Sequence, residues 1–337
     1  MRKRKTLVTA AAALVLTVAF GVFGLGSGFA NPAGPITLNF VSYVDLAHPT
    51  GYKFLKREFI DKINEQAKGE LFIKVRGGPE VIPSFDLGVA VQKRTIDLAT
   101  IPTAFFESLV PGADSTKMSD YTAWEERENG IFEYIQAMYE KGGLFYLGRA
   151  QATDPNYFVM YLNKRVEKPQ DFAGLKLGGS TAFHGFYKEL GASVATIPLP
   201  EYYSAMERRI VDGISTSIYL GVTFGIVEVT KYVISHGFYR CTAALVVNPD
   251  SWNGLPKHLQ KLLMDSMIEF EKKYTLFDRG LRAETMKKAE AAGVEIITFS
   301  PDVTKWFYEA AEKGSWKYAQ ERFPGDVIPK LRERITK

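Results

Sequence analysis

The 337-residue sequence is poor in the residues that carry most enzymatic chemistry. Its one cysteine, Cys241, cannot form a disulfide within the chain. It has four histidines, His48, His184, His236 and His258, and no two of them have the spacing of a helical metal pair. It also has no P-loop, no dinucleotide-binding glycine motif and no nucleophile elbow. We therefore expect no cofactor and no metal, and an enzymatic function is disfavoured.

Cys241 and His236 are close in sequence, which raises the question of a catalytic pair. Both belong to an apolar stretch that is typical of a strand. A cysteine in such a stretch usually packs in the core as a small apolar side chain. The sequence therefore predicts a structural cysteine.

Hydrophobic runs of membrane length are confined to the N-terminus. Four basic residues at positions 2–5 precede an apolar stretch at about 7–25, which ends in the small residues Gly28 and Ala30. This pattern predicts a secretory signal peptide, residues 1–30, cleaved after Ala30. An uncleaved membrane anchor is the alternative, because the apolar stretch approaches the length of a bilayer span. Cleavage is favoured, and no nearby cysteine could be lipidated, so we expect a free periplasmic protein.

The sequence has no excess of either charge once residues 1–30 are removed. The whole chain has 42 Lys and Arg against 38 Asp and Glu, and the signal peptide contains four of the basic residues and no acidic one. The mature chain therefore has 38 of each and is formally neutral. Nothing in this balance indicates a nucleic-acid partner or an anionic membrane surface.

The first half of the mature chain predicts strands that alternate with helices. Residues 36–40 alternate as in a strand, and a helical periodicity runs from Pro49 to Gly69. Strands are predicted at 71–75 and 96–101, with a second helix between them. This order is typical of a largely parallel sheet.

The second half repeats the same order of elements. A strand at 175–177 leads to a helix that Ser180 or Thr181 can cap and that ends at Gly191, and a strand at 194–197 precedes another helix. Ala90–Asp97 and Ala205–Asp212 match in residue type at an offset of 115. The match is short, and an amphipathic helix running into a buried strand could produce it by chance. It gives modest support for two similar α/β lobes, which would hold a ligand in the cleft between them.

Several segments, in this order along nearly all of the mature chain, resemble the solute-binding subunits of TRAP transporters, the DctP-like family. The segments are His48-Pro49, Lys62–Val75, Gly77–Pro83, Lys168–Leu177, Leu190–Ala192, Pro198, Glu201–Glu207, Ile210–Gly213, Val227–Tyr232 and Trp252–Lys261.

This resemblance implies an α/β, two-lobed periplasmic binding protein fold (type II-like) with long bridging helices, closing over its ligand. We expect lobe one at 36–148 plus 240–280, and lobe two at 149–239 plus 281–330. The implied function is capture of a small-molecule ligand for the membrane subunits of a TRAP transporter, by a monomer that does no chemistry. A receptor for an ABC importer and a sensory protein that presents ligand to a membrane kinase are the alternatives.

The resemblance also points to a binding site, with one departure from the family pattern. Members usually have an arginine that clamps a substrate carboxylate directly after the strand that ends at Leu177, and here that position is Gly178. A second arginine of many members corresponds to Arg149, for which an ion pair is the alternative role. Other pocket positions follow from their places in the motifs. They are Tyr43, Thr103, Phe105, Thr181 and Thr216, with Glu80 and Tyr219 as neighbours for which a solvated and a packing role, respectively, remain open.

These positions make the expected pocket more aromatic and less cationic than is usual in the family. Gly178 would leave volume for a bulkier ligand, whose ring could stack on Tyr43 or Phe105. The helix start at 178–181 offers N–H groups to a negative group. We expect a small organic acid or a related polar molecule. A neutral ligand and an arginine from elsewhere in the fold remain open alternatives.

Overall fold

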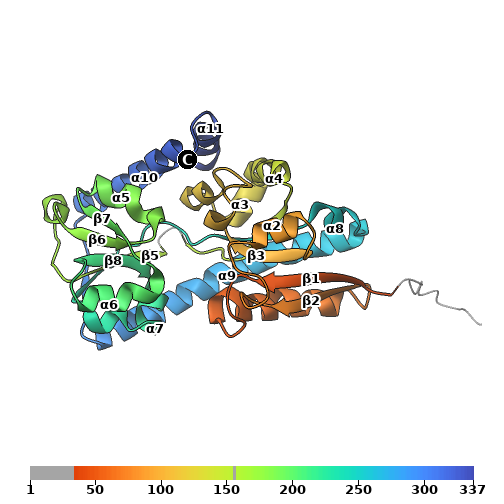
Figure 1. The fold of residues 1–337 in the computed structure, drawn as a ribbon, viewed down its shortest axis with the longest axis horizontal. Helices are drawn as coiled ribbons and strands as arrows, with labels where there is room; N and C mark the ends of the chain where they lie inside the picture. The colour runs from red at the N-terminus through yellow and green to blue at the C-terminus, as the bar shows by residue number, and fades with distance from the viewer. Residues whose placement is uncertain (1–33, 155–156) are drawn as a thin grey trace, which may run out of the picture. The chain divides into compact units, whose positions relative to one another are not determined.

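The computed structural model describes residues 34–154 and 157–337, so the predicted signal peptide lies outside the described residues (Figure 1). Residues Pro35–Lys337 form one compact unit. The unit contains a five-stranded and a six-stranded sheet, each covered by helices. We call the parts built on them lobe one and lobe two.

The sheet of lobe one has the strand order β2-β1-β3-β10-β4. β1 pairs in parallel with β2 and β3, as predicted, whereas β10 runs antiparallel to both β3 and β4. The antiparallel strand arises because the chain enters β10 on its return from lobe two. The strands are β1 (Ile36–Ser42), β2 (Leu71–Gly77), β3 (Leu98–Pro102), β4 (Phe145–Arg149) and β10 (Ala243–Val247).

The helix predicted from Pro49 forms, but its first turns are wider than an α-helix. His48 caps it, because its ring nitrogen Nδ1 accepts a hydrogen bond from the Gly51 N–H, and Pro49 occupies the first turn. The helix ends before Gly69, which has a φ of +85°. The helical elements of this lobe are η1 (Pro49–Lys53), η2 (Lys56–Ile60), α1 (Asp61–Gln66), α2 (Leu87–Gln92), η3 (Thr103–Phe105), η4 (Ala113–Met118), α3 (Ala123–Glu128), α4 (Ile131–Lys141) and α8 (Pro249–Asn253).

The sheet of lobe two has the strand order β11-β9-β5-β8-β6-β7. β6 pairs in parallel with β7 and β8, and β5 runs antiparallel to β8 and β9. Its strands are β5 (Phe158–Leu162), β6 (Lys176–Gly179), β7 (Ser193–Thr196), β8 (Gly213–Ser217), β9 (Tyr232–Ile234) and β11 (Glu295–Ile297). Its helical elements are η5 (Pro169–Phe172), η6 (Thr181–Phe183), α5 (His184–Glu189), η7 (Leu199–Glu201), α6 (Tyr202–Glu207), α7 (Ile218–Thr223) and η8 (Ile226–Val229).

Two long helices contribute to the cores of both lobes. The 35-residue α9 (Lys257–Ala291) buries Phe270 in lobe one and Ala289 in lobe two. α10 (Pro301–Arg322) buries Phe307 in lobe two and Trp316 in lobe one. The last helix, α11 (Val327–Ile335), packs in lobe one through Leu331. The assignment of 281–330 to lobe two therefore does not hold for the end of α10 and the start of α11.

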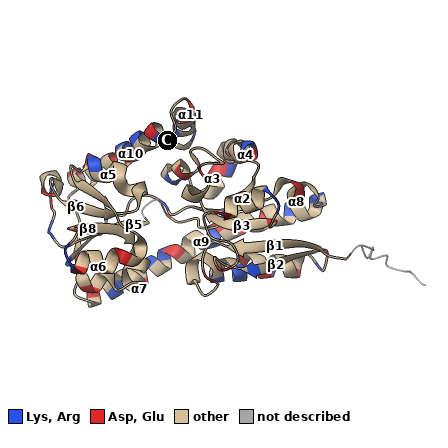
Figure 2. Ribbon diagram, in the orientation of Figure 1, with Lys and Arg blue, Asp and Glu red and all other residues tan. Residues whose placement is uncertain are grey.

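Two further connections join the sheets, and we call their described residues, 150–154 with 157 and 235–242, the first and second crossing segments. Lys and Arg lie interspersed with Asp and Glu on both lobes, as expected for a neutral mature chain (Figure 2). None of the helices in residues 34–154 and 157–337 is long and apolar enough to cross a membrane.

Candidate functional site

Tyr43 follows β1 and contacts the first crossing segment. Its side chain is half-buried, and its hydroxyl donates a hydrogen bond of 2.8 Å to Gln151 Oε1. The Cys241 thiol, from the second crossing segment, donates to the same oxygen at 3.3 Å. Burial, followed by the nearby Cys241, raises the pKa of Tyr43 well above its usual value. Tyr43 therefore stays a neutral hydrogen-bond donor at physiological pH.

Cys241 has the environment of a structural cysteine. Burial, followed by the charge of Asp278, raises the pKa of its thiol to about 12. The thiolate is the nucleophilic form, and it is scarcely populated at neutral pH with such a pKa. The geometry therefore agrees with the predicted structural role.

Tyr219, from lobe two, and Tyr43, from lobe one, both lie near His48. The Tyr219 ring, on α7, lies 6.5 Å from the His48 ring, measured between centroids. A side chain built on Gly51 would place its Cβ 3.2 Å from both the His48 ring and the Tyr43 hydroxyl. Burial lowers the pKa of His48, which favours the neutral ring at physiological pH. His48, of lobe one, thus lies between lobe-two Tyr219 and the neighbourhood of Tyr43, and the role of both tyrosines in ligand binding stays a prediction.

Thr103 and Phe105, after β3, have different surroundings. Thr103 is buried, and its hydroxyl donates to Asp114 Oδ1 at 3.0 Å and contacts Thr242 Oγ1 at 2.7 Å. Phe105 is half-buried and packs at a tilt against Phe85, with ring centroids 4.1 Å apart. Phe85 is 69% exposed, so this pair presents an aromatic surface to solvent. Phe105 is therefore available to a ligand ring, whereas Thr103 is already engaged within lobe one.

Thr181 and Thr216, in lobe two, differ in exposure. Thr181 is exposed at the start of η6, and the preceding Ser180 caps the turn by accepting a hydrogen bond from the Ala182 N–H. Thr216 lies buried in β8, opposite Val159 of β5. In this conformation only Thr181 presents its side chain to solvent.

Gly178 does not leave the open volume that we expected. A Cβ at this position would lie 2.6 Å from Ile197 Cδ1 and 3.0 Å from Val211 Cγ1. Contacts this short show that neighbouring apolar side chains already fill the space. The interpretation that Gly178 makes room for a bulkier ligand is therefore wrong for this conformation.

Glu80 is exposed and bonds to its own loop. Its Oε1 atom accepts a hydrogen bond of 2.7 Å from the Gly78 N–H. The carboxylate thus stabilises the glycine-rich turn after β2. This geometry favours the solvated role that the sequence left open.

Arg149 is buried with its guanidinium paired to a carboxylate. Its Nε and Nη2 atoms donate to the two oxygens of Glu126, and Nη2 also lies 3.4 Å from the Thr116 carbonyl. The Arg149 backbone N–H donates to Glu271 Oε1 at 2.8 Å. The two-pronged donor that we expected to face a ligand carboxylate is therefore engaged within lobe one, which is the alternative role. Only its Nη1 atom is without a partner among the described residues.

Three functional candidates were not predicted from the sequence. Gln151 accepts from both Tyr43 and Cys241, and Arg240 is a buried cation next to Cys241. Asp278, on α9, is 5% exposed, and burial raises the pKa of its carboxyl to about 7. One signal was available, because Arg240 interrupts an otherwise apolar stretch.

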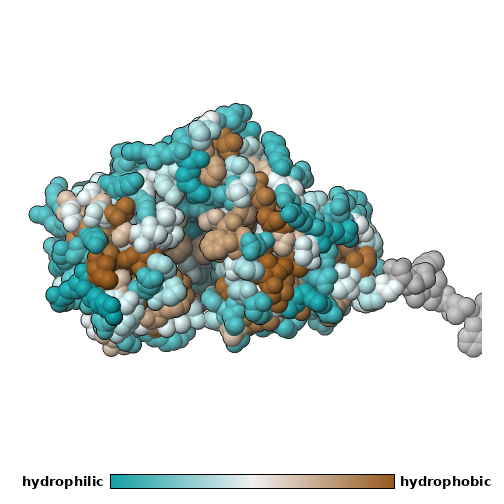
Figure 3. Space-filling view, viewed as in Figure 1, coloured by the Kyte–Doolittle hydropathy of each residue, from teal (hydrophilic) through white to brown (hydrophobic). Residues whose placement is uncertain are grey.

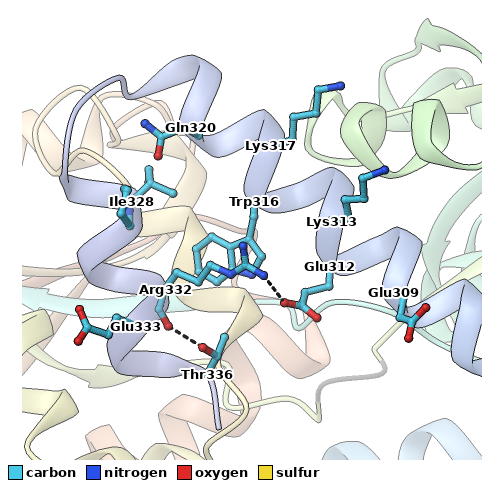
Figure 4. Close-up of a pocket in the computed structure, with 11 residues that line it drawn as sticks. Glu309, Glu312, Lys313, Trp316, Lys317, Gln320, Ile328, Arg332, Glu333 and Thr336 are labelled. Carbon is cyan, nitrogen blue, oxygen red and sulfur yellow. Dashed lines mark hydrogen bonds and ion pairs between the residues drawn. The ribbon is translucent and has the colours of Figure 1, made fainter.

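A further groove lies elsewhere, between α10 and α11 (Figure 4). It has a volume of about 870 Å³, and the Arg332 guanidinium covers the Trp316 ring while pairing with Glu312 at 3.0 Å. Lys313 and Lys317 point away from Trp316 (Figure 4). None of the predicted site residues lines this groove.

Comparison with known proteins identifies the family. Residues 40–321 match the family described as bacterial extracellular solute-binding protein, family 7, or DctP. A solute-binding protein of Albidiferax ferrireducens is 24% identical over 274 residues, covering 78% of this chain and 80% of that protein. The ectoine-binding periplasmic protein TeaA of Halomonas elongata is 24% identical over 229 residues, covering 64% and 66%.

A solved structure has the same fold. The TRAP periplasmic solute-binding protein of Desulfovibrio salexigens, with bound orotic acid, superposes with a TM-score of 0.72 at 17% identity. The match covers 88% of this chain and 97% of that one. At this identity, the likeness shows the two-lobed fold alone. The family match, which spans most of the chain, shows more: the protein belongs to the DctP family of periplasmic solute-binding proteins of TRAP transporters.

Proposed function

We propose that this protein captures one small organic acid, or a related polar molecule, between its two lobes and delivers it unchanged to TRAP membrane subunits. The observation that carries the proposal is the approach of Tyr43 and Tyr219 to His48 from opposite lobes. A ligand held at this boundary would contact both lobes. Ligand binding would then favour closure, because the ligand gains contacts only in the closed state.

The surroundings of these residues support a ligand held mainly by neutral groups. Tyr43 is a neutral donor, and Phe105 with Phe85 forms an exposed aromatic surface. Glu126 engages the guanidinium of Arg149, and Ile197 fills the space beside Gly178. The bound molecule would therefore contact hydroxyl groups and aromatic rings rather than an arginine. The surface is hollowed between the two lobes, where such a molecule could enter (Figure 3).

The relatives suggest which compounds to test first. They are named as binding proteins for ectoine, 2,3-diketo-L-gulonate and C4-dicarboxylates, and the Desulfovibrio protein holds orotic acid. A thermal-shift screen of the mature protein with these compounds should yield at least one that raises the melting temperature, because binding to the folded state stabilises it by mass action.

Three measurements then test the proposal with the best compound. Calorimetry should give one site per chain, mass spectrometry should recover the compound unchanged, and solution scattering should show a more compact protein at saturation. Turnover of the compound would overturn the binding-protein function, and an unchanged scattering profile would overturn closure. Mass spectrometry of the exported protein should give an N-terminus at Asn31, and light scattering should give a monomer.

A further inference from the structure

A small cavity lies beside the first crossing segment, where α3 and α9 approach it. Its volume is about 20 Å³, which leaves room for one water molecule or one atomic ion and excludes an organic ligand. It is lined by Thr122, Ala123, Arg149, Ala152, Thr153, Asp154, Arg240 and Thr275.

Two buried arginines that line this cavity each have an unused donor. Arg149 is 3% exposed and Arg240 is 4% exposed. Within the described residues, neither Arg149 Nη1 nor Arg240 Nε has a hydrogen-bond partner. A buried donor without a partner loses its hydration with nothing in return, so such groups are rare in folded proteins. Two of them beside one cavity indicate an acceptor inside it.

One of the two arginines that line the cavity has no ion-pair partner among the described residues. Arg149 pairs with Glu126, Arg127 with Glu271 and Arg279 with Asp154. Arg240 donates to the Tyr121 carbonyl, and no carboxylate of the described residues lies within 4.0 Å of its guanidinium. Burial, followed by the charge of Arg149, lowers the pKa of Arg240 to about 10, so the side chain is still charged at pH 7. Among the described residues, Arg240 is therefore a buried cation without an ion-pair partner, and Glu126, Asp154 and Asp120 favour its charge only from a greater distance.

A water molecule in the cavity would accept hydrogen bonds but would leave this charge uncompensated. A monovalent anion would accept the hydrogen bonds and would also compensate the charge. A buried charge is tolerated when it is paired and hydrogen-bonded. The cavity volume restricts the anion to a single atom or its equivalent.

We propose that the cavity is a binding site for one halide ion, chloride under physiological conditions, held between Arg149 and Arg240. Arg149 ends β4 at the start of the first crossing segment, and Arg240 lies in the second. The ion thus connects the two segments on which the lobes would move. Binding of the halide in this cavity would not require the transported solute.

The test compares sodium chloride with sodium gluconate at equal ionic strength, using the ligand-free mature protein. Because the two salts screen charges alike at equal ionic strength, chloride should raise the melting temperature above that in gluconate, and the rise should saturate. The expected rise is about 2–4 °C at ten times the dissociation constant. Bromide should act similarly. Equal melting temperatures in the two salts would mean that water fills the cavity, and the proposal would fail.

Two variants show whether the effect comes from this cavity. Arg240→Gln should lose the chloride-dependent rise, because it removes the uncompensated charge. Arg282→Gln is the matched control, since Arg282 is half-buried on α9 but does not line the cavity. It should keep the rise. An equal rise in wild type and Arg240→Gln would identify a general salt effect and overturn the site.

Crystals of the wild-type protein grown in bromide provide a measurement that does not depend on a variant folding. An anomalous peak between Arg149 and Arg240 would support the site. Anomalous data of sufficient strength without a peak there would overturn it.

Discussion

The residues around Tyr43 and Tyr219 differ from the residues beside the crossing segments in the kind of side chain that they contain. The first group is aromatic, and the second contains buried ion pairs. Tyr43, Phe105 and Tyr219 are half-buried aromatic side chains. Near the start of the first crossing segment, Arg127 pairs with Glu271 and Arg149 pairs with Glu126, and each of these side chains is at most 9% exposed. This difference suggests that buried charge fixes the connection between the lobes while neutral and aromatic groups meet the ligand.

The two regions should therefore respond differently to substitution. Removing one member of a buried ion pair leaves the other charge uncompensated, which strongly destabilises the fold. Removing a hydroxyl from a half-buried tyrosine costs about one hydrogen bond. Glu126→Gln, Asp278→Asn and Tyr43→Phe test this contrast, and Gly178→Ala tests the packing beside Gly178.

The largest effect is expected from Glu126→Gln. Glu126 is 2% exposed and engages Arg149 through both carboxylate oxygens. The substitution should lower the free energy of unfolding by about 3–5 kcal/mol, measured by urea denaturation. Glu128→Gln, on an exposed position just beyond it in α3, is the matched control and should change stability by less than about 0.5 kcal/mol. If both variants had wild-type stability, Arg149 would not depend on Glu126, and its role as a ligand anchor would return.

Asp278→Asn should make stability less dependent on pH. Burial, followed by the charge of Asp154, raises the pKa of Asp278 to about 7 in the folded protein, above the unfolded value of about 3.9. The folded state therefore holds the proton more tightly, so this contribution to stability is complete below about pH 4 and is lost as the pH rises through about 7. Asp278→Asn should be more stable than wild type at pH 8, by on the order of a few kcal/mol, and should lose this advantage at pH 4.

Urea denaturation across this pH range gives the measurement. Asp265→Asn is the control, because Asp265 lies exposed on the same helix. Parallel pH profiles for wild type and Asp278→Asn would show that folding does not raise the pKa of Asp278.

Gly178→Ala should have an intermediate effect. The added Cβ would meet Ile197 and Val211, and overpacking of this kind typically costs about 1–3 kcal/mol. Gly280→Ala, on α9 with no atom within 4 Å of the new Cβ, should instead gain up to about 1 kcal/mol from helix propensity. A Gly178→Ala protein of wild-type stability with weakened ligand binding would restore the idea that the ligand uses this space.

The repeated order of strands and helices was predictable from the sequence because it depends on local periodicity. The match at an offset of 115 also has a structural counterpart. α2 leads into β3, and α6 leads into β8, and both strands lie in parallel with a neighbour in their sheets. Arg94 and Arg209, at equivalent places in the match, both have a positive φ, +58° and +56°. A residue other than glycine is uncommon there, so this shared geometry supports a common unit in the two lobes.

The pairings across the chain were not predictable from spacing. Glu126 lies 23 residues from Arg149 and Glu271 lies 122 residues away, so no local pattern joins them. The filled space beside Gly178 depends on Ile197 and Val211, which lie just after β7 and between α6 and β8. The apolar pattern of β10 does not indicate its direction in the sheet. Its antiparallel direction follows from the path of the chain between the lobes.

Tyr43→Phe should have the smallest effect on stability and is the most direct test of the recognition surface. It removes the hydrogen bond to Gln151, which should lower the free energy of unfolding by about 0.5–1.5 kcal/mol. The ring remains, so an aromatic contact with the ligand would persist, and the affinity measured by calorimetry should fall by less than about tenfold. Tyr43→Ala should weaken binding further, because it removes the ring as well. Tyr203→Phe, on the half-buried Tyr203 of α6, controls for loss of a tyrosine hydroxyl and should bind as wild type. If Tyr43→Ala bound the ligand as tightly as wild type, the residues around Tyr43 would not form the ligand-binding surface.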